Sequence, residues 1–557
     1  LYGLSAFSIN NCGRNKKYVV NLQKKQMRFY QFFVLLVIIS LFSCARRGRP
    51  EGGPIDEDKP IMVRSEPDFG TVNFKEEEIK IYFDEFIKLK DISQQLIVSP
   101  PLKYPLVIVP QGTASKFINI KIIDTLLENT TYTFNFGQSV VDNTEGNVLD
   151  NFRFVLSTGD YIDSLNIKGT IRDAFELEPA EGAIVMLYPY IDNFNDSIVF
   201  SERPTYVGAM TDSLNFEVNN IKEGKYALLA LKDKNRNFKY NKKEDKIAFY
   251  NQIIEVPSTS DYPLVLFTED KDFRLPAKPS EITKGLFFIG YEGNIDSLEV
   301  RAITETPVNF KEHWAPSVKT DTIKYWFTNY EKDSLDIFIR NRSFTDTITL
   351  KLREDKIDSL KFESITSGSL DLRDTLKIET NNPVFELDTS KIKLFKSDSI
   401  DVKYTLIQDK YKTSMYLFFE KEFDSKYKLN LYEGALTDIF GTSHDSIKKN
   451  FSTKRPSNYS SIYLTINNIK EYPVIVELVD QKGMGVATSY LTRKEEVRFE
   501  NIQPGKFKVR LIYDANKNGK WDAGNYLKKI QPELVVYFKN VLTANSNWEI
   551  VETLTIQ

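Results

Sequence analysis

The chain has 557 residues, of which 41% are hydrophobic and 13% aromatic, enough apolar material for several packed cores and too much for wholesale disorder. Its 74 basic and 77 acidic residues give a net charge of −3, so no chain-wide positive field indicates a nucleic-acid partner. It has only two histidines, which depletes the commonest general base and transition-metal ligand and disfavours an enzyme.

An apolar run that ends at a cysteine is the first feature in chain order. Residues 32–42 are too few to cross about 30 Å of hydrocarbon as a helix. They are typical of the apolar h-region of a signal peptide, and that signal peptide would start near Met27. The run Leu41-Phe42-Ser43-Cys44 resembles a bacterial lipobox. The resemblance implies cleavage before Cys44, lipidation of Cys44 and an outer-membrane anchor whose leaflet stays open; a short membrane anchor with an incidental cysteine is the alternative. We expect residues 1–43 to be an upstream extension plus signal peptide, and residues 44–54 a Pro/Gly-rich linker.

Residues 55–160 alternate in strand fashion, with strands predicted at Ile79–Asp84 and Tyr132–Phe136. Together with the turn Asp142–Gly146 and a closing strand Phe154–Thr158, they resemble the S-layer-type bacterial Ig-like domain. This resemblance extends to the Ig-like lipoproteins of Bacteroidota and implies a β-sandwich.

A weaker copy of this plan is predicted at residues 378–455. In that copy Tyr427 stands in place of Tyr132, Asp438 in place of Asp142, and residues 451–453 in place of residues 156–158. We therefore expect a second Ig-like unit.

An ungapped internal duplication is the most informative pattern in the chain. Residues 216–237 match residues 497–518 at a constant offset of 281, which is typical of an array of repeated modules. Residues 161–275 open with Ile167-x-Gly169-x-Ile171-x-Asp173 and resemble the carboxypeptidase-regulatory or transthyretin-like β-sandwich. Residues 457–557 are predicted to be its copy, and residues 280–377 a further β-rich domain. The predicted fold is therefore all-β, with tandem Ig-like and transthyretin-like sandwiches after a lipoprotein signal peptide.

A loop rich in Asp and Asn follows the Gly-Lys-aromatic strand of each copy. Oxygen-bearing side chains at alternate positions have the spacing of a calcium loop, yet Phe238 stands where the first loop needs glycine and Asn525 where the second needs Glu. Two interpretations stay open: a weak structural Ca²⁺ site, or an Asx-rich turn that closes two strands. The candidate ligands are Asp233, Asn235, Asn237, Asn241 and Glu244 in the first loop, and Asp514, Asn516, Asn518 and Asp522 in the second.

No catalytic signature is recognisable, so we predict no catalytic residues, and no cofactor apart from that calcium. His313 and His444 are expected in surface loops. The leading functional prediction is a non-catalytic binding or scaffold module of the outer membrane, accessory to an envelope protein complex. The alternative is a glycan-binding or glycan-processing surface protein, for which Trp314, Tyr325 and Trp326 are the only local aromatic cluster.

Overall fold

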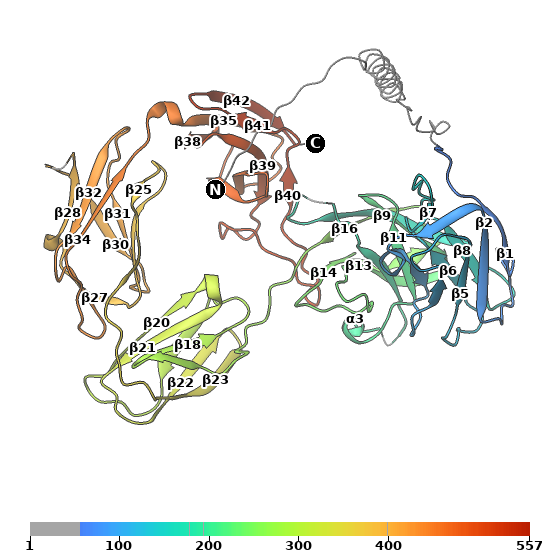
Figure 1. Ribbon diagram of the computed structural model, residues 1–557, viewed down its shortest axis with the longest axis horizontal. Coiled ribbons are helices and arrows are strands. Elements are labelled where there is room, and N and C mark those ends of the chain that lie inside the picture. The colour runs from blue at the N-terminus through green and yellow to red at the C-terminus, as the bar shows by residue number, and fades with distance from the viewer. Residues whose placement is uncertain (1–55, 178, 193, 398, 557) are drawn as a thin grey trace, which may run out of the picture. The chain divides into compact units, whose positions relative to one another are not determined.

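A computed structural model describes residues 56–177, 179–192, 194–397 and 399–556 (Figure 1). The all-β prediction is confirmed, because the described part of the chain is built from many short strands. Five short helices interrupt them: α2 (Ile92–Gln95), α3 (Ile198–Ser201), η1 (Val318–Thr320), η2 (Thr389–Lys391) and η3 (Pro456–Asn458). We refer to the five predicted β-rich ranges 55–160, 161–275, 280–377, 378–455 and 457–557 as modules 1 to 5.

Module 1 is a sandwich of two sheets with the orders β1-β2-β5-β4 and β3-β6-β8, and β7 pairs with β2. Inward residues of both sheets, such as Ile81 and Phe134, belong to one buried cluster. The alternating burial along β2 reflects the two-residue period of a strand that has one face on the core. Its strands are β1 (Met62–Glu66), β2 (Glu78–Leu89), β3 (Ile97–Ser99), β4 (Val107–Val109), β5 (Ser115–Lys121), β6 (Thr131–Asn135), β7 (Val140–Asp142) and β8 (Arg153–Ser157).

Module 2 is one eight-stranded sheet with the order β14-β13-β10-β11-β12-β9-β16, and β15 pairs with β13. The interior of β13 is buried at every position from Tyr226 to Leu231 because separate clusters cover both of its faces. Its strands are β9 (Leu165–Asp173), β10 (Ile184–Pro189), β11 (Tyr206–Met210), β12 (Asn215–Ile221), β13 (Gly224–Lys232), β14 (Lys246–Phe249), β15 (Ile254–Val256) and β16 (Asp261–Leu266).

The glycine of the opening motif of module 2 is explained by a close approach. A Cβ on Gly169 would lie 2.1 Å from the carbonyl oxygen of Tyr262, on the parallel neighbour β16, and 2.8 Å from the Phe216 ring. Asp173, at the end of the motif, accepts hydrogen bonds from the N–H groups of Phe175 and Glu176, which fixes the turn that follows.

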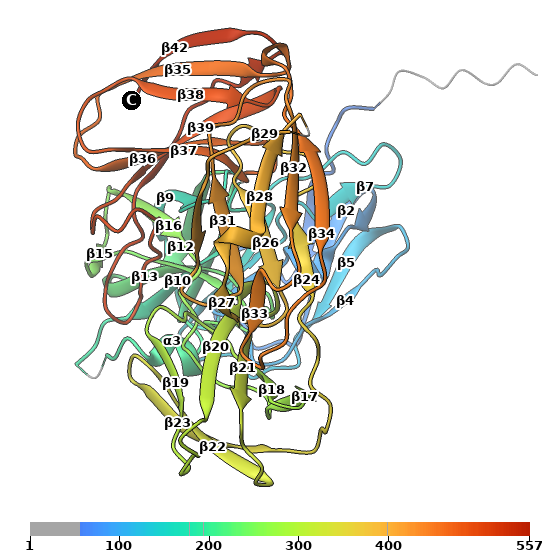
Figure 2. The same cartoon turned by 90° about the vertical axis from the view of Figure 1, so that its left-hand side faces the viewer.

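Module 5 repeats most of the strand pairings of module 2, with β36 between β37 and β39 and with β42 parallel to β35 (Figure 2). The sheet of module 5 is divided because β37 and β38 do not pair as β11 and β12 do. Its strands are β35 (Ser460–Asn467), β36 (Val474–Val479), β37 (Gly485–Leu491), β38 (Val497–Ile502), β39 (Gly505–Tyr513), β40 (Val535–Tyr537), β41 (Leu542–Ala544) and β42 (Glu549–Thr555).

Module 3 has two sheets, with the orders β17-β18-β21-β20 and β19-β22-β23, around one aromatic-rich core. Its strands are β17 (Ser280–Thr283), β18 (Leu286–Gly290), β19 (Leu298–Ala302), β20 (Lys311–Ser317), β21 (Thr322–Thr328), β22 (Ser334–Asn341) and β23 (Phe344–Lys351).

Module 4 holds three sheets, with the orders β24-β26-β31-β30, β25-β34-β32-β28-β29 and β27-β33. β24 and β25 lie in the chain before residue 378, at which this unit was predicted to begin. Its strands are β24 (Phe362–Ile365), β25 (Gly368–Ser369), β26 (Leu376–Thr380), β27 (Val384–Leu387), β28 (Ile392–Lys396), β29 (Ile400–Asp401), β30 (Thr405–Gln408), β31 (Ser414–Phe418), β32 (Lys426–Leu431), β33 (Leu436–Asp438) and β34 (Ile447–Ser452).

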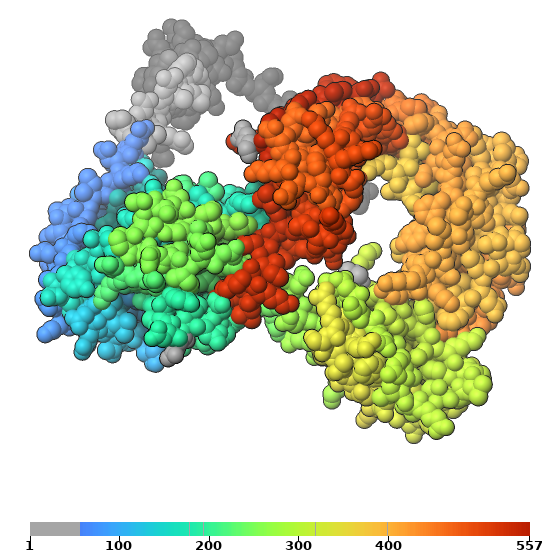
Figure 3. All heavy atoms as spheres, turned by 180° about the vertical axis from the view of Figure 1, so that it is seen from behind, coloured from blue at the N-terminus to red at the C-terminus, as the bar shows by residue number. Residues whose placement is uncertain are grey.

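Modules 1 and 4 share a tyrosine-centred corner. The hydroxyl of Tyr132 accepts a hydrogen bond from the N–H of Leu127, and that of Tyr427 accepts one from the N–H of Glu422, five residues earlier in each case. The hydroxyls of Thr158 and Thr453 donate to the carbonyl oxygens of the same two residues, Leu127 and Glu422. The predicted correspondence of Tyr427 with Tyr132 is therefore confirmed at the level of hydrogen bonds. Figure 3 shows the heavy atoms of the same modules as spheres, coloured along the chain.

Candidate functional site

The predicted lipidation residue, Cys44, lies outside the described residues, so its lipidation stays a prediction. Within the described ranges, no helix is both long enough and apolar enough to span a membrane.

The first Asp/Asn loop (residues 233–245) is closed by Asp233. One carboxylate oxygen of Asp233 accepts the N–H groups of Asn235 at 3.0 Å and Arg236 at 2.8 Å, and the other accepts the N–H of Phe238 at 2.7 Å. Phe238 has a φ of +60°, a left-handed conformation that glycine adopts more readily.

The second loop (residues 514–533) is also closed by its first aspartate, and the contact to Gly519 corresponds to the contact of Asp233 to Phe238. The carboxylate of Asp514 accepts the N–H groups of Asn518 at 3.0 Å and Gly519 at 2.8 Å, and Gly519 has a φ of +78°. Phe238 and Gly519 are related by the offset of 281, so one backbone conformation occurs in both copies with different side chains. The missing glycine of the first loop therefore does not change how that loop is folded.

A bridging carboxylate that the sequence did not predict holds each loop together. Asp245 accepts the N–H groups of Lys234 at 3.0 Å and Asn241 at 2.8 Å. Glu533 accepts the N–H groups of Ala515 at 2.8 Å and Asp522 at 3.1 Å, which are the same two positions at the offset of 281. Burial raises the pKa of both carboxyl groups.

The other candidate ligands bond to one another inside each loop. Glu244 accepts the side-chain amides of Asn235 at 2.7 Å and Asn241 at 3.2 Å. Asp522 accepts those of Asn516 and Asn518, each at 2.6 Å, in the second loop.

The fifth candidate of the first loop, Asn237, accepts the N–H of Lys239 at 2.8 Å. Among the described residues no group of three or more His, Cys, Asp or Glu side chains is arranged to hold a metal ion. These contacts support the Asx-turn interpretation, and calcium binding stays a prediction.

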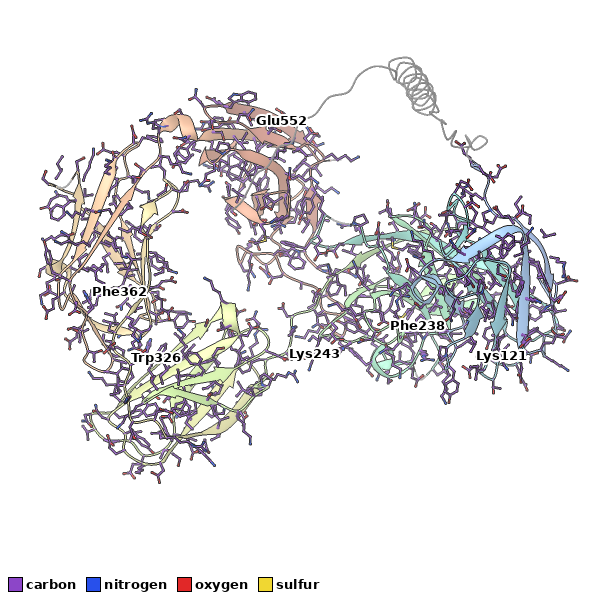
Figure 4. All side chains as sticks on the ribbon, in the orientation of Figure 1. Lys121, Phe238, Lys243, Trp326, Phe362 and Glu552 are labelled. Atoms are coloured by element: carbon purple, nitrogen blue, oxygen red, sulfur yellow. The ribbon has the colours of Figure 1, made fainter. Side chains whose placement is uncertain are left out.

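The aromatic cluster of module 3 is not an exposed platform, which corrects the sequence-based interpretation. Tyr325 and Trp326 have no exposed surface. The Tyr325 hydroxyl donates to Glu312, and the Trp326 indole donates to Asn382 at 3.3 Å. Figure 4 labels Trp326 in module 3. Trp314 is only partly buried, but a sugar-binding surface needs several accessible rings. The proposed basis for glycan binding is therefore wrong at these residues.

The expectation of a surface loop is wrong for His313, and for His444 the loop is confirmed but the exposure is not. His313 lies within β20, and its Nε2 is 2.9 Å from the carbonyl oxygen of Tyr411. Desolvation on burial lowers the pKa of His313. His444 does lie in a loop, but it is only 5% exposed and packs against Phe362.

Polar contacts join module 1 to module 2 at Asn220. The side chain of Asn220 accepts the hydroxyl of Thr133 at 2.9 Å and donates to the carbonyl oxygen of Asp163 at 2.7 Å. Asn220 and its counterpart Asn501 both have left-handed φ, 56° and 54°, at a bulge that ends β12 and β38. The duplicated Asn is thus explained by backbone conformation, because Asn tolerates this region better than most residues.

A segment of module 5 contacts module 2 through a buried tyrosine. Tyr526 is 1% exposed and belongs to a cluster that otherwise consists mainly of module 2 residues, including Phe249 and Phe267. The N–H of Tyr526 donates to Glu269 at 2.6 Å, and Lys529 pairs with Asp196 at 2.6 Å.

The same segment is where the two copies differ in length. In module 2, Leu229 on β13 pairs with Phe249 on β14, and in module 5, Arg510 on β39 pairs with Tyr537 on β40. The offset between the copies is therefore 281 from β13 to β39 but 288 from β14 to β40. Module 5 therefore carries seven additional residues between the two loop ends. We call residues 523–531, which include this insertion, the docking segment.

Residues 56–158 match the family model described as Bacterial Ig-like domain. The match supports an Ig-like β-sandwich for module 1. The matched segment contains the tyrosine corner at Tyr132, and Thr133 on the central strand β6 makes the contact with module 2.

No curated protein matches the chain. Among solved structures, it is similar to alpha-2-macroglobulin from Escherichia coli, at 10% identity over 34% of this chain and 97% of that chain, with a TM-score of 0.18. It is similar to the S-layer protein SbsC at 11% identity over 87% of this chain and 67% of that one, with a TM-score of 0.15. It is also similar to the Down Syndrome Cell Adhesion Molecule at 9% identity over 90% of this chain and 61% of that one, with a TM-score of 0.15. At these scores the likenesses carry no functional argument.

Proposed function

We propose that the protein is an outer-membrane lipoprotein that acts as a non-catalytic, multidomain binding scaffold, accessory to an envelope protein complex. The observation that carries the proposal is the docking segment, whose buried Tyr526 ties module 5 to module 2. A scaffold has to hold its modules together against thermal motion. A buried tyrosine with a hydrogen-bonded main chain does this far better than a flexible linker.

The junction between modules 1 and 2 supports the same proposal. Thr131, 2% exposed, donates to Asp163, 8% exposed, at 2.9 Å, and the N–H of Asp163 donates back to the Thr131 hydroxyl at 2.9 Å. Reciprocal buried hydrogen bonds of this kind cost more to break than exposed ones. We therefore expect modules 1 and 2 to move as one body.

Cys44 supplies the proposed anchor. Lipidation at this residue would keep the array at high local concentration beside a membrane partner. The partner is proposed to be an envelope protein, and the leaflet that the array faces is left open. The glycan-binding alternative is not favoured by any aromatic platform at Trp314, Tyr325 and Trp326.

Membrane fractionation tests the anchor. The proposal expects the wild-type protein in the outer-membrane fraction, and the Cys44→Ala protein in the soluble envelope fraction or as unprocessed precursor. A Cys12→Ala variant is the matched control, because this cysteine has no lipobox before it. If Cys44→Ala stays in the outer membrane unchanged, the proposed anchoring fails.

A further inference from the structure

A groove in module 1, closed on one side by module 2, has an apolar lining and a cationic rim. It has a volume of about 370 Å³ and is formed mainly by residues 92–111 of module 1, with Arg203, Arg236 and Phe238 from module 2. Arg236 and Phe238 belong to the first Asp/Asn loop, but none of the candidate calcium ligands lines the groove.

The apolar lining rests on the core of the Ig-like domain. Leu96, Val98, Leu102 and Leu106 are partly buried and pack against its central cluster, which leaves part of each side chain facing outward. Because the core holds them from beneath, these side chains form a fixed floor. A fixed apolar floor lowers the ordering cost of binding.

Phe238 forms part of the wall at the position where the second copy has Gly519. A non-glycine residue at φ +60° is strained, and strain of this kind tends to collect at functional sites. The same loop is built in module 5 with a glycine, so the fold does not require phenylalanine here. The ring that stands here in place of glycine packs against the core of module 2 on one side and lines the groove on the other.

The charge of the lining has one sign. Lys103, Arg203 and Arg236 line the groove, and its lining includes no Asp or Glu. Arg236 donates to the main-chain carbonyl oxygens of Ser93 and Gln94, and Arg203 donates to that of Leu102. Carbonyl groups orient these guanidinium groups but do not neutralise them, so the groove attracts an anion.

Two observations favour an acyl chain over a peptide as the occupant. First, a peptide would have to desolvate a main-chain amide at every residue, and it would need hydrogen-bonding partners in the groove. Among the neutral side chains of the lining, only Ser93 carries an aliphatic hydroxyl and only Gln111 an amide. If each chain atom takes about 30 Å³, as a liquid water does, the cavity accommodates about twelve atoms. This is the length of a medium-chain acyl group.

We propose that this groove binds a medium-chain acyl group that carries an anionic head, with the chain on the leucine floor against Phe238 and the head beside Arg203 and Arg236. Burial of successive methylene groups on the apolar floor offsets the cost of association. The inference does not depend on the proposed scaffold function.

The test is calorimetric titration of the mature chain with the anchor removed by Cys44→Ser. The probe is dodecanoate below its critical micelle concentration. Dodecyltrimethylammonium is the matched ligand, since it has the same chain and the opposite charge. We expect dodecanoate to bind at one site, and the cationic analogue to bind at least about tenfold more weakly, a difference of about 1.4 kcal/mol.

Three variants locate the site. Phe238→Gly copies the residue of module 5 and should weaken dodecanoate binding at least about tenfold. Because it also removes packing against the core of module 2, its melting temperature is measured beside its affinity, at a temperature where the variant is folded. Arg236→Gln should weaken it by a similar factor. Lys517→Gln, the same position in module 5, should bind as the unsubstituted chain does. Equal binding of the two amphiphiles, no binding of dodecanoate, or unchanged binding in both Phe238→Gly and Arg236→Gln would overturn the proposal.

Discussion

Truncation of Tyr526 to alanine should release the docking segment while leaving the core of module 5 intact. Tyr526 belongs to the cluster of module 2 and not to the central cluster of module 5. Because Tyr526 is 1% exposed, most of its roughly 150–250 Å² of surface is buried. At about 25 cal/mol per Å² this corresponds to about 4–6 kcal/mol, an upper bound, and buried aromatic-to-alanine changes cost about 3–5 kcal/mol.

A loss of about 3 kcal/mol raises the population of the open segment about a hundredfold. Lys528 and Lys529 lie within the segment, so trypsin reports its opening. When opening is fast relative to cleavage, the cleavage rate follows the open population. We therefore expect Tyr526→Ala to be cut at these lysines much faster than the wild-type protein.

Tyr161→Ala is the matched control. Tyr161 is 55% exposed, so its removal should change stability by no more than about 0.5 kcal/mol and leave the cleavage rate unaltered. Equal cleavage of the wild-type and Tyr526→Ala proteins at Lys528 and Lys529 would refute the docking argument.

Three further results are expected. Gly169→Ala should lower the free energy of unfolding by about 2 kcal/mol or more in denaturant titration, since its Cβ would meet the carbonyl oxygen of Tyr262 at 2.1 Å; unchanged stability would contradict the strand contact. Burial lowers the pKa of His313, and its hydrogen bond to Tyr411 opposes that shift. The unfolded chain therefore binds a proton that the folded chain does not, so the free energy of unfolding should fall as the pH drops below about 6.5. This fall should be smaller in His313→Gln. Millimolar Ca²⁺ should leave the melting temperature unchanged, because N–H donors already occupy Asp233 and Asp514; a rise of several degrees would establish the calcium site instead.

Much of the fold could be predicted because it follows from local periodicity and from the duplication. The two-residue alternation along residues 79–84 predicts β2, and the constant offset of 281 predicts that β13 and β39 correspond. Tyr132 and Tyr427 were paired by sequence alone, and their hydrogen bonds agree.

The features that escaped prediction depend on packing between distant residues. Trp326 is buried because Ile439 from module 4 belongs to the cluster that covers it, and nothing in the local sequence around Trp326 encodes that contact. Glu533 could not be matched to Asp245, because the seven-residue insertion shifts the offset from 281 to 288 just before it. The docking segment lies in that same interruption, so the break in the repeat was itself the signal that could have located it.

The central claim is that this array is a non-catalytic scaffold with an envelope protein partner. The most direct test is to crosslink and purify the tagged lipoprotein from outer membranes and to identify the bound proteins by mass spectrometry. The account predicts one envelope protein or complex in a fixed ratio to the lipoprotein, and a lower yield of that partner from Tyr526→Ala at equal membrane loading. Recovery of the lipoprotein alone would contradict it.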